Sequence, residues 1–446
     1  MYLERVKQLE GKMRYEMTSC ERTCILQSKL YQKAKQESEY NFYVLYDKVF
    51  LKYVLEEAWR EVRRSGGGAG VDGVSIKDIE QGDVKSYLED LGEDLRKRTY
   101  KTQAVKRVWI PKSNGGERPL GIPTIRDRIA QAACKLIIEP IFEADLQSCS
   151  HGIRPGHSAA DAIRDIKSNL HAGKTEVYDA DLTKYFDTIP HDKLMIVLQL
   201  RIADPRILHL IKQWLKAPIE DKGKISGGKS NQTGVPQGGV ISPLLANIYM
   251  SLIDRSIIRS DSIFSKYGIK IIRYADDFVL MGTQLITVAE EKLKELLTRM
   301  GLTLNEDKTK KINSTESSFD FLGFTFRYDK DLQGRNHKYL NIFPSKKSEK
   351  KLKEKIKDYL DTHGMCNPTT ISMGLNKILC GSFNYYDIPQ VTYTKHIRRK
   401  IRYYLMEKLN RYNKRKSQRK SRLYRQGAYE ILIQKYGLVD IITYNL

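Results

Sequence analysis

Three aspartates at the ends of apolar segments have residue types and spacing suited to metal-assisted chemistry. Asp276 and Asp277 stand together between the apolar runs of Ile269–Met281, and Asp181 ends the apolar segment that begins at Glu176. Adjacent carboxylates at a hairpin tip can bind Mg²⁺, which prefers carboxylate oxygen together with substrate phosphate. Two such ions roughly 3.5–4 Å apart would hold the attacking and leaving oxygens of a phosphoryl transfer. The pattern predicts a two-metal site. A solvated turn is the alternative for the doublet taken alone.

A glycine-rich segment, 234–247, is a second candidate for contact with a ligand. Its side chain Gln237 offers both a hydrogen-bond donor and an acceptor. Backbone can approach a ligand closely at its glycines, Gly234, Gly238 and Gly239. The apolar run after Ser242 predicts a helix packed beneath the site. An ordinary loop followed by a helix is the alternative.

The composition indicates an ordered protein with a polyanionic partner. The chain has 446 residues, is 41% hydrophobic and carries a formal net charge of +23. This length predicts two or three domains, and this charge points first to nucleic acid, with a solvated basic surface as the alternative. No apolar run is long enough to cross a membrane, and the N-terminus has no signal core. We expect a cytoplasmic protein, free or at the nucleoid, whose six cysteines are reduced thiols.

The order of helix and strand patterns changes along the chain. Residues 1–62 and 76–97 predict helices, and the glycine-rich stretch 65–73 between them predicts a turn or loop. Residues 112–118 predict a hairpin turn between short strands, after which a helix at 125–142 opens a mixed α and β region that continues to 326. Beyond it, apolar stripes predict a separate all-helical segment. The stripes are Leu352, Ile356 and Leu360, and Ile397, Ile401, Leu405 and Leu409.

Taken together, the motifs resemble those of reverse transcriptases. The resemblance rests on Asp181–Asp187, on Val-Pro-Gln-Gly at 235–238 and on Tyr-Ala-Asp-Asp at 274–277. It is strongest to the reverse transcriptases encoded by group II introns, also called maturases, and extends from about residue 26 to 412. Further matching segments lie at 70–73, 110–123, 150–156, 187–191, 304–309, 321–324 and 375–385.

The resemblance implies a metal site. Asp181, Asp276 and Asp277 would be the catalytic carboxylates and would bind two Mg²⁺ ions, with Mn²⁺ able to substitute. The backbone carbonyl of Leu182 would be a further ligand.

The resemblance also implies a nucleotide site. Lys112 and Arg118 would bind the triphosphate of the incoming dNTP, in keeping with the need of a polyanion for cations. Gln237 would support the nucleotide from below, and the ring of Phe186 would exclude a ribose 2′-hydroxyl. Lys308 would lie near the leaving pyrophosphate as a proton donor, with an ordinary surface lysine as the alternative.

A basic segment near the C-terminus is expected to bind the template–primer duplex. Residues 395–425 include 14 Lys or Arg and one acid, Glu407. Phosphate contacts from such a helix are the simplest expectation, and a solvated charged helix is the alternative. The expected contacts are Arg398, Arg399, Arg402, Arg411, Lys414 and Arg415. The N-terminal helices are expected either to bind structured intron RNA or to be a packing extension.

The resemblance implies an α+β right-hand polymerase. Its parts would be an N-terminal helical extension (1–60), fingers and palm with an antiparallel palm sheet (61–335), and an α-helical thumb with a basic C-terminal segment (336–446). Many group II proteins continue into an endonuclease. Here the chain stops at Leu446 with no Cys pair and His residues beyond Cys380, so self-sufficient second-strand cleavage is not expected.

Four functions remain open at this stage. The first is an RNA-directed DNA polymerase that extends a DNA or RNA primer on an RNA template with dNTPs and also assists intron splicing as a maturase. The second is an RNA-binding splicing cofactor. The third is a domesticated reverse transcriptase in defence, repair or CRISPR spacer acquisition. The fourth is an RNA-dependent RNA polymerase, which Phe186 disfavours. No membrane partner is expected.

Overall fold

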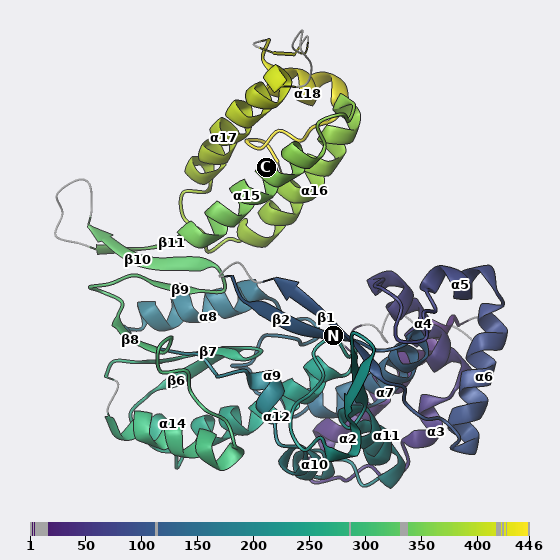
Figure 1. The fold of residues 1–446 in the computed structure, drawn as a ribbon. Coiled ribbons are helices and arrows are strands. Elements are labelled where there is room, and N and C mark those ends of the chain that lie inside the picture. The colour runs from purple at the N-terminus through teal and green to yellow at the C-terminus, as the bar shows by residue number, and fades with distance from the viewer. Residues whose placement is uncertain are drawn as a thin grey trace. The chain divides into compact units, whose positions relative to one another are not determined.

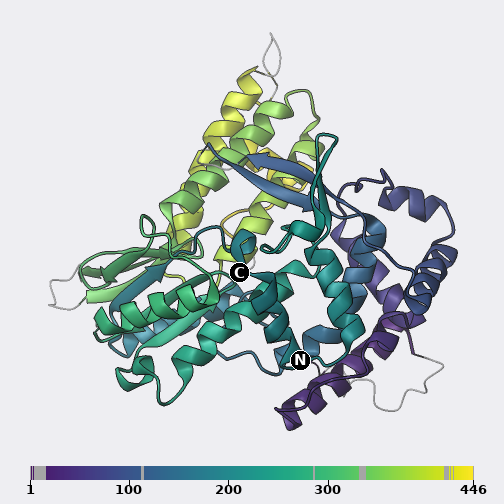
Figure 2. The same cartoon turned by 60° about the horizontal axis from the view of Figure 1, so that its bottom comes forward.

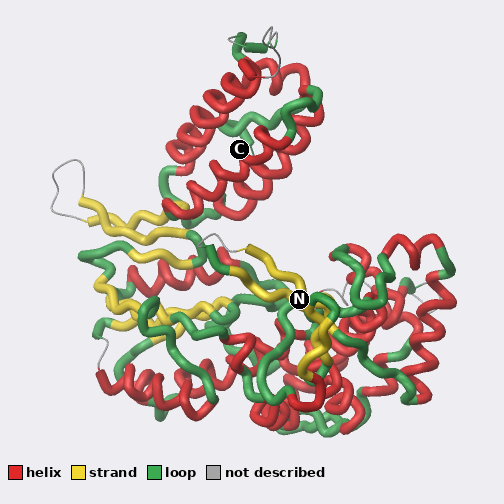
Figure 3. Tube along the Cα trace, viewed as in Figure 1, coloured by secondary structure: helices red, strands yellow, loops and turns green. Residues whose placement is uncertain are grey.

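The computed structural model describes residues 2, 4, 17–111, 115–284, 287–330, 338–415, 421, 423–424 and 426–444. They form two compact units, which we call the first unit (Met1–Ala162 and Tyr178–Lys310) and the second unit (Ile163–Val177 and Lys311–Leu446). Figure 1 labels the helices and strands, and Figure 3 shows short strand patches among many helices. This mixed α and β fold with several small sheets confirms the coarse fold class.

The N-terminal part of the first unit is helical, as expected from residue 19 onward. Its helices, purple and dark blue in Figure 2, are α2 (Ser19–Gln36), α3 (Tyr46–Val49), α4 (Lys52–Ser65), α5 (Ile76–Gln81) and α6 (Val84–Lys97). The expected single helix at 76–97 is in fact two helices. The break falls at Gly82 and Asp83, and the Asp83 side chain caps α6 by accepting a hydrogen bond from Lys85 N.

The glycine-rich loop between α4 and α5 is tied to the core of the first unit. A Cβ added at Gly70 would lie 2.6 Å from the Cα of Thr124, so only glycine permits this approach. Thr124 in turn caps α7 (Ile125–Glu143) by accepting from Asp127 N. Helix α7 is buried on nearly every side, as its run of Ile, Ala and Leu predicts for a helix in a core.

Among the remaining helices of the first unit, α12 packs against α7, α10 and α13, and α10 packs against α11. Helix α12 follows the glycine-rich segment 234–239 at the expected place, and most of its residues are buried. The helices are α9 (Tyr185–Thr188), α10 (His191–Gln199), α11 (Pro205–Leu215), α12 (Ser242–Ile258), α13 (Ile263–Lys266) and α14 (Thr287–Met300). Helix α8 (Ala159–His171) begins in the first unit and ends in the second.

Two four-stranded sheets carry the segments of interest. The first has the order β2-β1-β4-β5 and consists of β1 (Val105–Pro111), β2 (Glu117–Ile122), β4 (Pro218–Asp221) and β5 (Lys224–Gly227). Strands β1 and β2 are antiparallel with Pro111 opposite Glu117, as two strands joined by a hairpin must be, while residues 112–114 of the predicted turn lie outside the described residues. The second sheet has the order β6-β7-β3-β8 and consists of β3 (Glu176–Ala180), β6 (Lys270–Tyr274), β7 (Asp277–Gly282) and β8 (Lys310–Asn313). The boundary between the units falls within β3 and β8.

The second unit contains a three-stranded sheet followed by helices. Strands β9 (Phe319–Phe321), β10 (Phe324–Lys330) and β11 (Lys338–Pro344) have the order β11-β10-β9. After them, the described residues contain helices and loops only, in α15 (Lys346–Thr362), α16 (Pro368–Tyr386), α17 (Thr394–Arg415) and α18 (Ala428–Tyr436). The predicted stripes on α15 and α17 are buried in one hydrophobic cluster, apart from the half-buried Ile397, which confirms the helices that these stripes predicted.

Candidate active site

The Asp276–Asp277 pair lies at the tip of the β6–β7 hairpin. The strands pair antiparallel from Lys270 opposite Met281 to Tyr274 opposite Asp277, leaving Ala275 and Asp276 as the loop. Ala275 has a φ of +59°, a region that favours glycine in such loops. The hairpin tip is therefore held in a conformation that the local sequence alone would not choose.

A buried arginine supports this tip. Arg273 is fully buried, and its Nη1 donates to Ala275 O at 2.8 Å and to Asn247 Oδ1 at 2.6 Å. Its Nε and Nη2 donate to the buried carboxylate of Asp254, with Nη2 to Oδ2 at 2.6 Å. A Cβ at Gly152 would lie 2.3 Å from Ala275 N, so this glycine lies directly against the tip. The carboxylates are thus presented by a rigid, hydrogen-bonded cradle.

Asp181 lies directly after β3 and is held by the segment 303–309. Its carbonyl accepts from Asn305 N at 2.8 Å, and Thr183 N donates to Thr303 O at 2.9 Å, around a bridge between Leu182 and Leu304. The same segment carries Lys308, whose Nζ lies 3.0 Å from Asp181 Oδ2. The structure therefore brings Lys308 to the carboxylate itself, a contact that the sequence did not predict.

The three carboxylates influence one another electrostatically. Burial raises the pKa of Asp276, and the charge of Asp181 raises it further, against the opposing effects of Arg118 and Arg273. Partial withdrawal from water, and then repulsion by Asp276 and Asp181, raise the pKa of Asp277 to about 6, while Lys308 opposes the shift. Such mutual repulsion is relieved by a proton or a cation. Carboxylate oxygens are also the ligands that suit Mg²⁺.

The carboxylate donor set fits divalent metal ions in its chemistry. Among the residues that the structure describes, no group of three or more His, Cys, Asp or Glu side chains is arranged to hold a metal ion. The Asp181 carboxylate is paired with Lys308 instead. A metal ion at Asp181 would compete with this ammonium, and the roles of Asp181, Asp276, Asp277 and the Leu182 carbonyl as ligands stay predictions.

Arg118 and Gln237 meet where strand β2 approaches the segment 234–239. Arg118 Nε donates to Gln237 Oε1 at 2.6 Å, and Gly121 N donates to Gln237 O at 2.6 Å. Gly238 has a φ of +110°, and a Cβ there would lie 2.1 Å from Gly121 O, so the close approach requires glycine. The structure thus brings together two residues expected to bind the nucleotide. Lys112, which was expected to bind the triphosphate with Arg118, lies outside the described residues.

Phe186 is half-buried in α9, beside the same segment. Its carbonyl accepts from Val235 N at 2.7 Å, and its ring lies edge-on to Tyr185 with centroids 5.6 Å apart. Tyr185 is fixed beneath it, because its hydroxyl donates to Ala246 O at 2.6 Å. The backbone of Phe186 is therefore tied to the segment that carries Gln237, and its ring packs against Tyr185.

The basic helix α17 does not present all of its expected contacts. Arg398 is buried and paired with Asp387, and its Nη1 donates to Ile442 O at 3.1 Å. This burial argues against its predicted contact with nucleic acid and indicates that the arginine supports the helical unit. Arg402 is half-buried and lies 3.4 Å from Glu430. The other expected contacts are exposed, namely Arg399, Arg411, Lys414 and Arg415, of which Arg411 pairs with Glu407.

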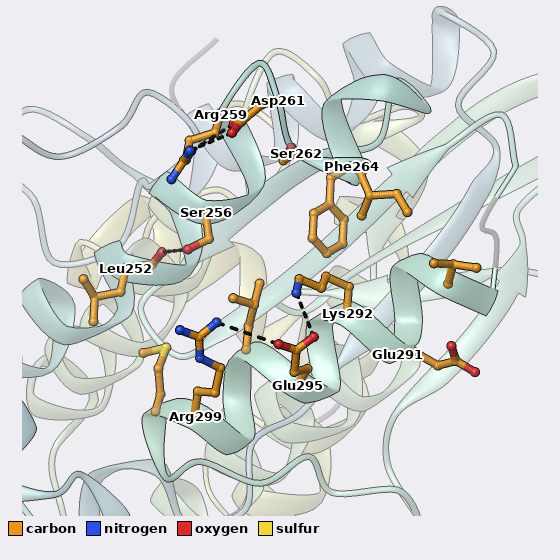
Figure 4. A pocket seen from close by; sticks show the side chains of 14 residues that line it. Leu252, Ser256, Arg259, Asp261, Ser262, Phe264, Glu291, Lys292, Glu295 and Arg299 are labelled. Carbon is orange, nitrogen blue, oxygen red and sulfur yellow. Dashed lines mark hydrogen bonds and ion pairs between the residues drawn. The ribbon is translucent and has the colours of Figure 1, made fainter.

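A large cavity lies elsewhere in the first unit, between α12, α13 and α14. It has a volume of about 850 Å³, and Figure 4 shows its lining side chains. The charged groups pair with one another, Arg259 with Asp261 and Lys292 and Arg299 with Glu295. None of the residues predicted to form the site lines it.

Several supporting residues were missed at the level of sequence. Arg273, Asn247 and Asp254 hold the hairpin tip, and Asp187 contacts Gln237. A signal existed for Arg273 and Asp254. Each is a charged residue inside an otherwise apolar segment, and a buried charge requires a partner.

Comparison with known proteins assigns the class. The family model described as reverse transcriptase (RNA-dependent DNA polymerase) matches residues 110–326, and that of the group II intron maturase-specific domain matches residues 349–428. The chain is 39% identical over 305 residues to Protein YkfC of Escherichia coli (strain K12), covering 60% of this chain and 79% of that protein. The chain belongs to the group II intron reverse transcriptase and maturase family, which confirms the resemblance.

Other relatives are longer than the matched region. The group II intron-encoded protein LtrA of Lactococcus lactis subsp. cremoris is 35% identical over 198 residues, covering 44% of this chain and 32% of LtrA. An uncharacterized 91 kDa protein in the cob intron of Schizosaccharomyces pombe is 28% identical over 321 residues, covering 60% of this chain and 38% of that protein. The match therefore spans about a third of these two relatives.

None of the described helices is long and apolar enough to cross a membrane.

Proposed function

We propose that this chain is an RNA-directed DNA polymerase that adds dNTPs to a primer 3′-hydroxyl on an RNA template. The observation that carries the proposal is the Asp276–Asp277 hairpin tip lying near enough to Asp181 that its charge adds to burial in raising the pKa values of Asp276 and Asp277. Mg²⁺ bound there would lower the pKa of the primer hydroxyl and neutralise charge on the pyrophosphate. The family supports divalent-metal use in general.

The residues of the chain would divide the remaining work. Asp181, Asp276 and Asp277 would hold the ions, with the Leu182 carbonyl as a further ligand. Arg118 would bind the triphosphate as a guanidinium suited to phosphate oxygens. Phe186 blocks the space of a 2′-hydroxyl, which favours DNA over RNA synthesis. Lys308, already within reach of Asp181, donates a proton to the leaving group.

The same proposal includes the right-hand arrangement and its boundaries. Residues 1–60 would be an N-terminal extension, 61–335 the fingers and palm, and 336–446 the thumb with its basic segment. The two family models match residues 110–326 and 349–428, which supports two parts with a division between residues 326 and 349. A cytoplasmic location is part of the proposal.

A maturase function is a second candidate. It is favoured by the match of residues 349–428 to the group II intron maturase-specific domain. In that case the exposed cations of α17, among them Arg399 and Lys414, would contact structured intron RNA as well as a template–primer duplex. A domesticated role in defence, repair or CRISPR spacer acquisition would use the same polymerase chemistry.

Primer extension tests the polymerase proposal. The purified protein should extend a DNA primer on an RNA template with dNTPs and Mg²⁺ or Mn²⁺. Asp276→Ala should abolish extension while its melting temperature stays close to that of the wild type. Asp261→Ala, which removes an exposed acid paired with Arg259, is the matched control and should extend normally. Equal rates for Asp276→Ala and the wild type would refute the assignment.

A further inference from the structure

Three side chains form a hydrogen-bonded chain through the candidate nucleotide site. Arg118 Nε donates to Gln237 Oε1 at 2.6 Å, and Gln237 Nε2 donates to Asp187 Oδ1 at 3.1 Å. Asp187 directly follows Phe186 in α9 and is not among the residues predicted to bind metal or nucleotide. Arg118 contacts the oxygen end of the Gln237 amide, and Asp187 contacts its nitrogen end.

The chemistry of the two partners fixes the orientation of the amide. A guanidinium only donates hydrogen bonds, and an ionised carboxylate only accepts them. The end of Gln237 that faces Arg118 must therefore be the oxygen, and the end that faces Asp187 must be the nitrogen. A side chain with mixed donor and acceptor character at position 187 would impose no such choice by itself.

Packing does not fix the amide. Gln237 and Asp187 line an open cavity of about 280 Å³, together with Arg107 and Asn231. Backbone contacts hold the segment but not the side chain: Val235 N donates to Phe186 O at 2.7 Å, and Gly234 N donates to Ile189 O at 2.8 Å. Because the Gln237 side chain borders this cavity, neighbouring atoms do not restrain its amide, and the hydrogen bonds to Arg118 and Asp187 determine its orientation.

We propose that Asp187 is a positioning residue that orients the Gln237 amide for the incoming nucleotide. This inference rests on the proposed function. When a triphosphate draws the Arg118 guanidinium away, Gln237 loses one of its two fixed partners. Asp187 then holds Nε2 alone and leaves Oε1 facing the nucleotide. Its negative charge keeps Asp187 itself away from the triphosphate, so it acts only through Gln237.

Steady-state kinetics of single-nucleotide extension test this role. Asp187→Ala should raise the KM for dNTP about tenfold, which corresponds to about 1.4 kcal/mol, and change kcat by less than about twofold. Asp187→Asn should recover only part of the affinity, because its Oδ1 can still accept from Gln237 Nε2 but its amide also permits the flipped orientation of Gln237. Asp192→Ala, an exposed acid in the neighbouring α10, is the matched control and should keep the wild-type KM.

A double-mutant cycle separates positioning from a general structural effect. In a Gln237→Ala background, Asp187→Ala should add less than about a twofold change in KM, because its only route to the nucleotide is gone. An equal loss in both backgrounds, a fall in kcat without a change in KM, or a wild-type KM in Asp187→Ala would overturn the inference.

A binding measurement keeps the test independent of catalysis. With primer and template present, dNTP should raise the melting temperature of the wild-type complex more than that of the Asp187→Ala complex. If the wild type bound dNTP but extended no primer, the proposed polymerase function would fail while this comparison still decided the role of Asp187. Equal dNTP-induced shifts in the two proteins would refute that role.

Discussion

Lys308 Nζ lies 3.0 Å from Asp181 Oδ2, so a lysine ammonium holds the carboxylate that is expected to bind metal. The pair is partly exposed, and its contribution is expected to be at most about 1 kcal/mol. A divalent cation that binds Asp181 has to compete with this ammonium. The lysine would then be released near the place where the pyrophosphate leaves.

Lys308→Gln is expected to separate the competition of Lys308 with metal at Asp181 from its role as proton donor to the pyrophosphate. Loss of the competing charge should lower the Mg²⁺ concentration for half-maximal extension by up to about fivefold, the equivalent of about 1 kcal/mol. The rate at saturating Mg²⁺ should fall, because the leaving group loses its proton donor. A Mg²⁺ titration of primer extension measures both. Lys310→Gln, a nearby exposed lysine, is the control. Unchanged half-saturation and rate would contradict both roles.

The pKa of about 6 at Asp277 predicts how stability depends on pH. In the unfolded chain this pKa is about 3.9. Between these values the folded protein binds more protons, so the contribution of Asp277 to stability falls as the pH rises through this window. Asp277→Asn should therefore raise the melting temperature of the metal-free protein at pH 8, and raise it less at pH 4. The expected increase at pH 8 is only about 1–3 °C, because solvent reaches the side chain and screens its charge.

Mg²⁺ provides the complementary measurement. It should raise the melting temperature of the wild type more at pH 8 than at pH 5, because at pH 5 a proton occupies Asp277. Asp307→Asn, a change at an exposed acid, is the control and should leave this difference intact. Equal Mg²⁺ effects at both pH values would show that Asp277 does not take part in metal binding.

The buried pair of Arg273 and Asp254 should be essential to the hairpin tip. Both side chains are fully buried, with Nη2 and Oδ2 2.6 Å apart. Asp254→Ala would leave a buried guanidinium without its counterion, and we expect a loss of about 3–5 kcal/mol in the free energy of unfolding. Chemical denaturation measures this loss. The double variant Arg273→Leu, Asp254→Leu should be more stable than Asp254→Ala, since no charge is left unpaired. It should still lose extension activity, because Ala275 is unsupported.

The sequence predicted the residues of the active site better than the contacts that hold them. Tyr274–Asp277 was recognisable because its motif is local and lies between apolar runs. The support from Asp254 is not local, since it lies 19 residues before Arg273 in another element. The left-handed conformation of Ala275 could not be expected either, because alanine does not favour it.

Helices and their buried faces were predicted well where the spacing of apolar residues determines them. They were predicted less well where polar side chains cap a helix or are buried in its packed face. The stripe Leu352, Ile356 and Leu360 is buried as expected. The break at Gly82 was missed, because capping by Asp83 outweighed the continuous helical pattern. Arg398 was expected to contact nucleic acid because it is charged, but its side chain is buried. It stands three residues before Ile401, on the buried stripe of α17, and this spacing was the available signal.

Phe186 provides a test of sugar selection. Phe186 is half-buried, and its backbone carbonyl accepts from Val235 N on the segment that carries Gln237. Phe186→Ala should open space for a ribose hydroxyl and lower the preference for dNTP over rNTP by about tenfold, equivalent to about 1.4 kcal/mol. Competition between dNTP and rNTP in primer extension measures this ratio. Phe264→Ala, a buried ring on α13, is a control for general loss of packing. An unchanged ratio in Phe186→Ala would argue against the gate.

The exposed cations at the end of α17 should bind the template–primer duplex through its phosphates. Arg411, Lys414 and Arg415 are exposed, whereas Arg398 on the same helix is buried. Each phosphate contact releases counterions, so the logarithm of the affinity should fall with the logarithm of salt concentration by about 0.9 per contact. Replacing the three exposed residues together with Ala should weaken binding and make this slope shallower by up to about 3.

Matched variants decide whether this effect is specific to α17. Replacing Lys292, Lys294 and Arg299 of α14 with Ala removes the same charge from a helix whose cations are paired with acids, and should leave the salt slope nearly unchanged. The loss in the α17 variant should be similar across template sequences, because phosphate contacts carry no base information. Wild-type affinity and slope in the α17 variant would show that its cations form a solvated face and that the duplex is held elsewhere.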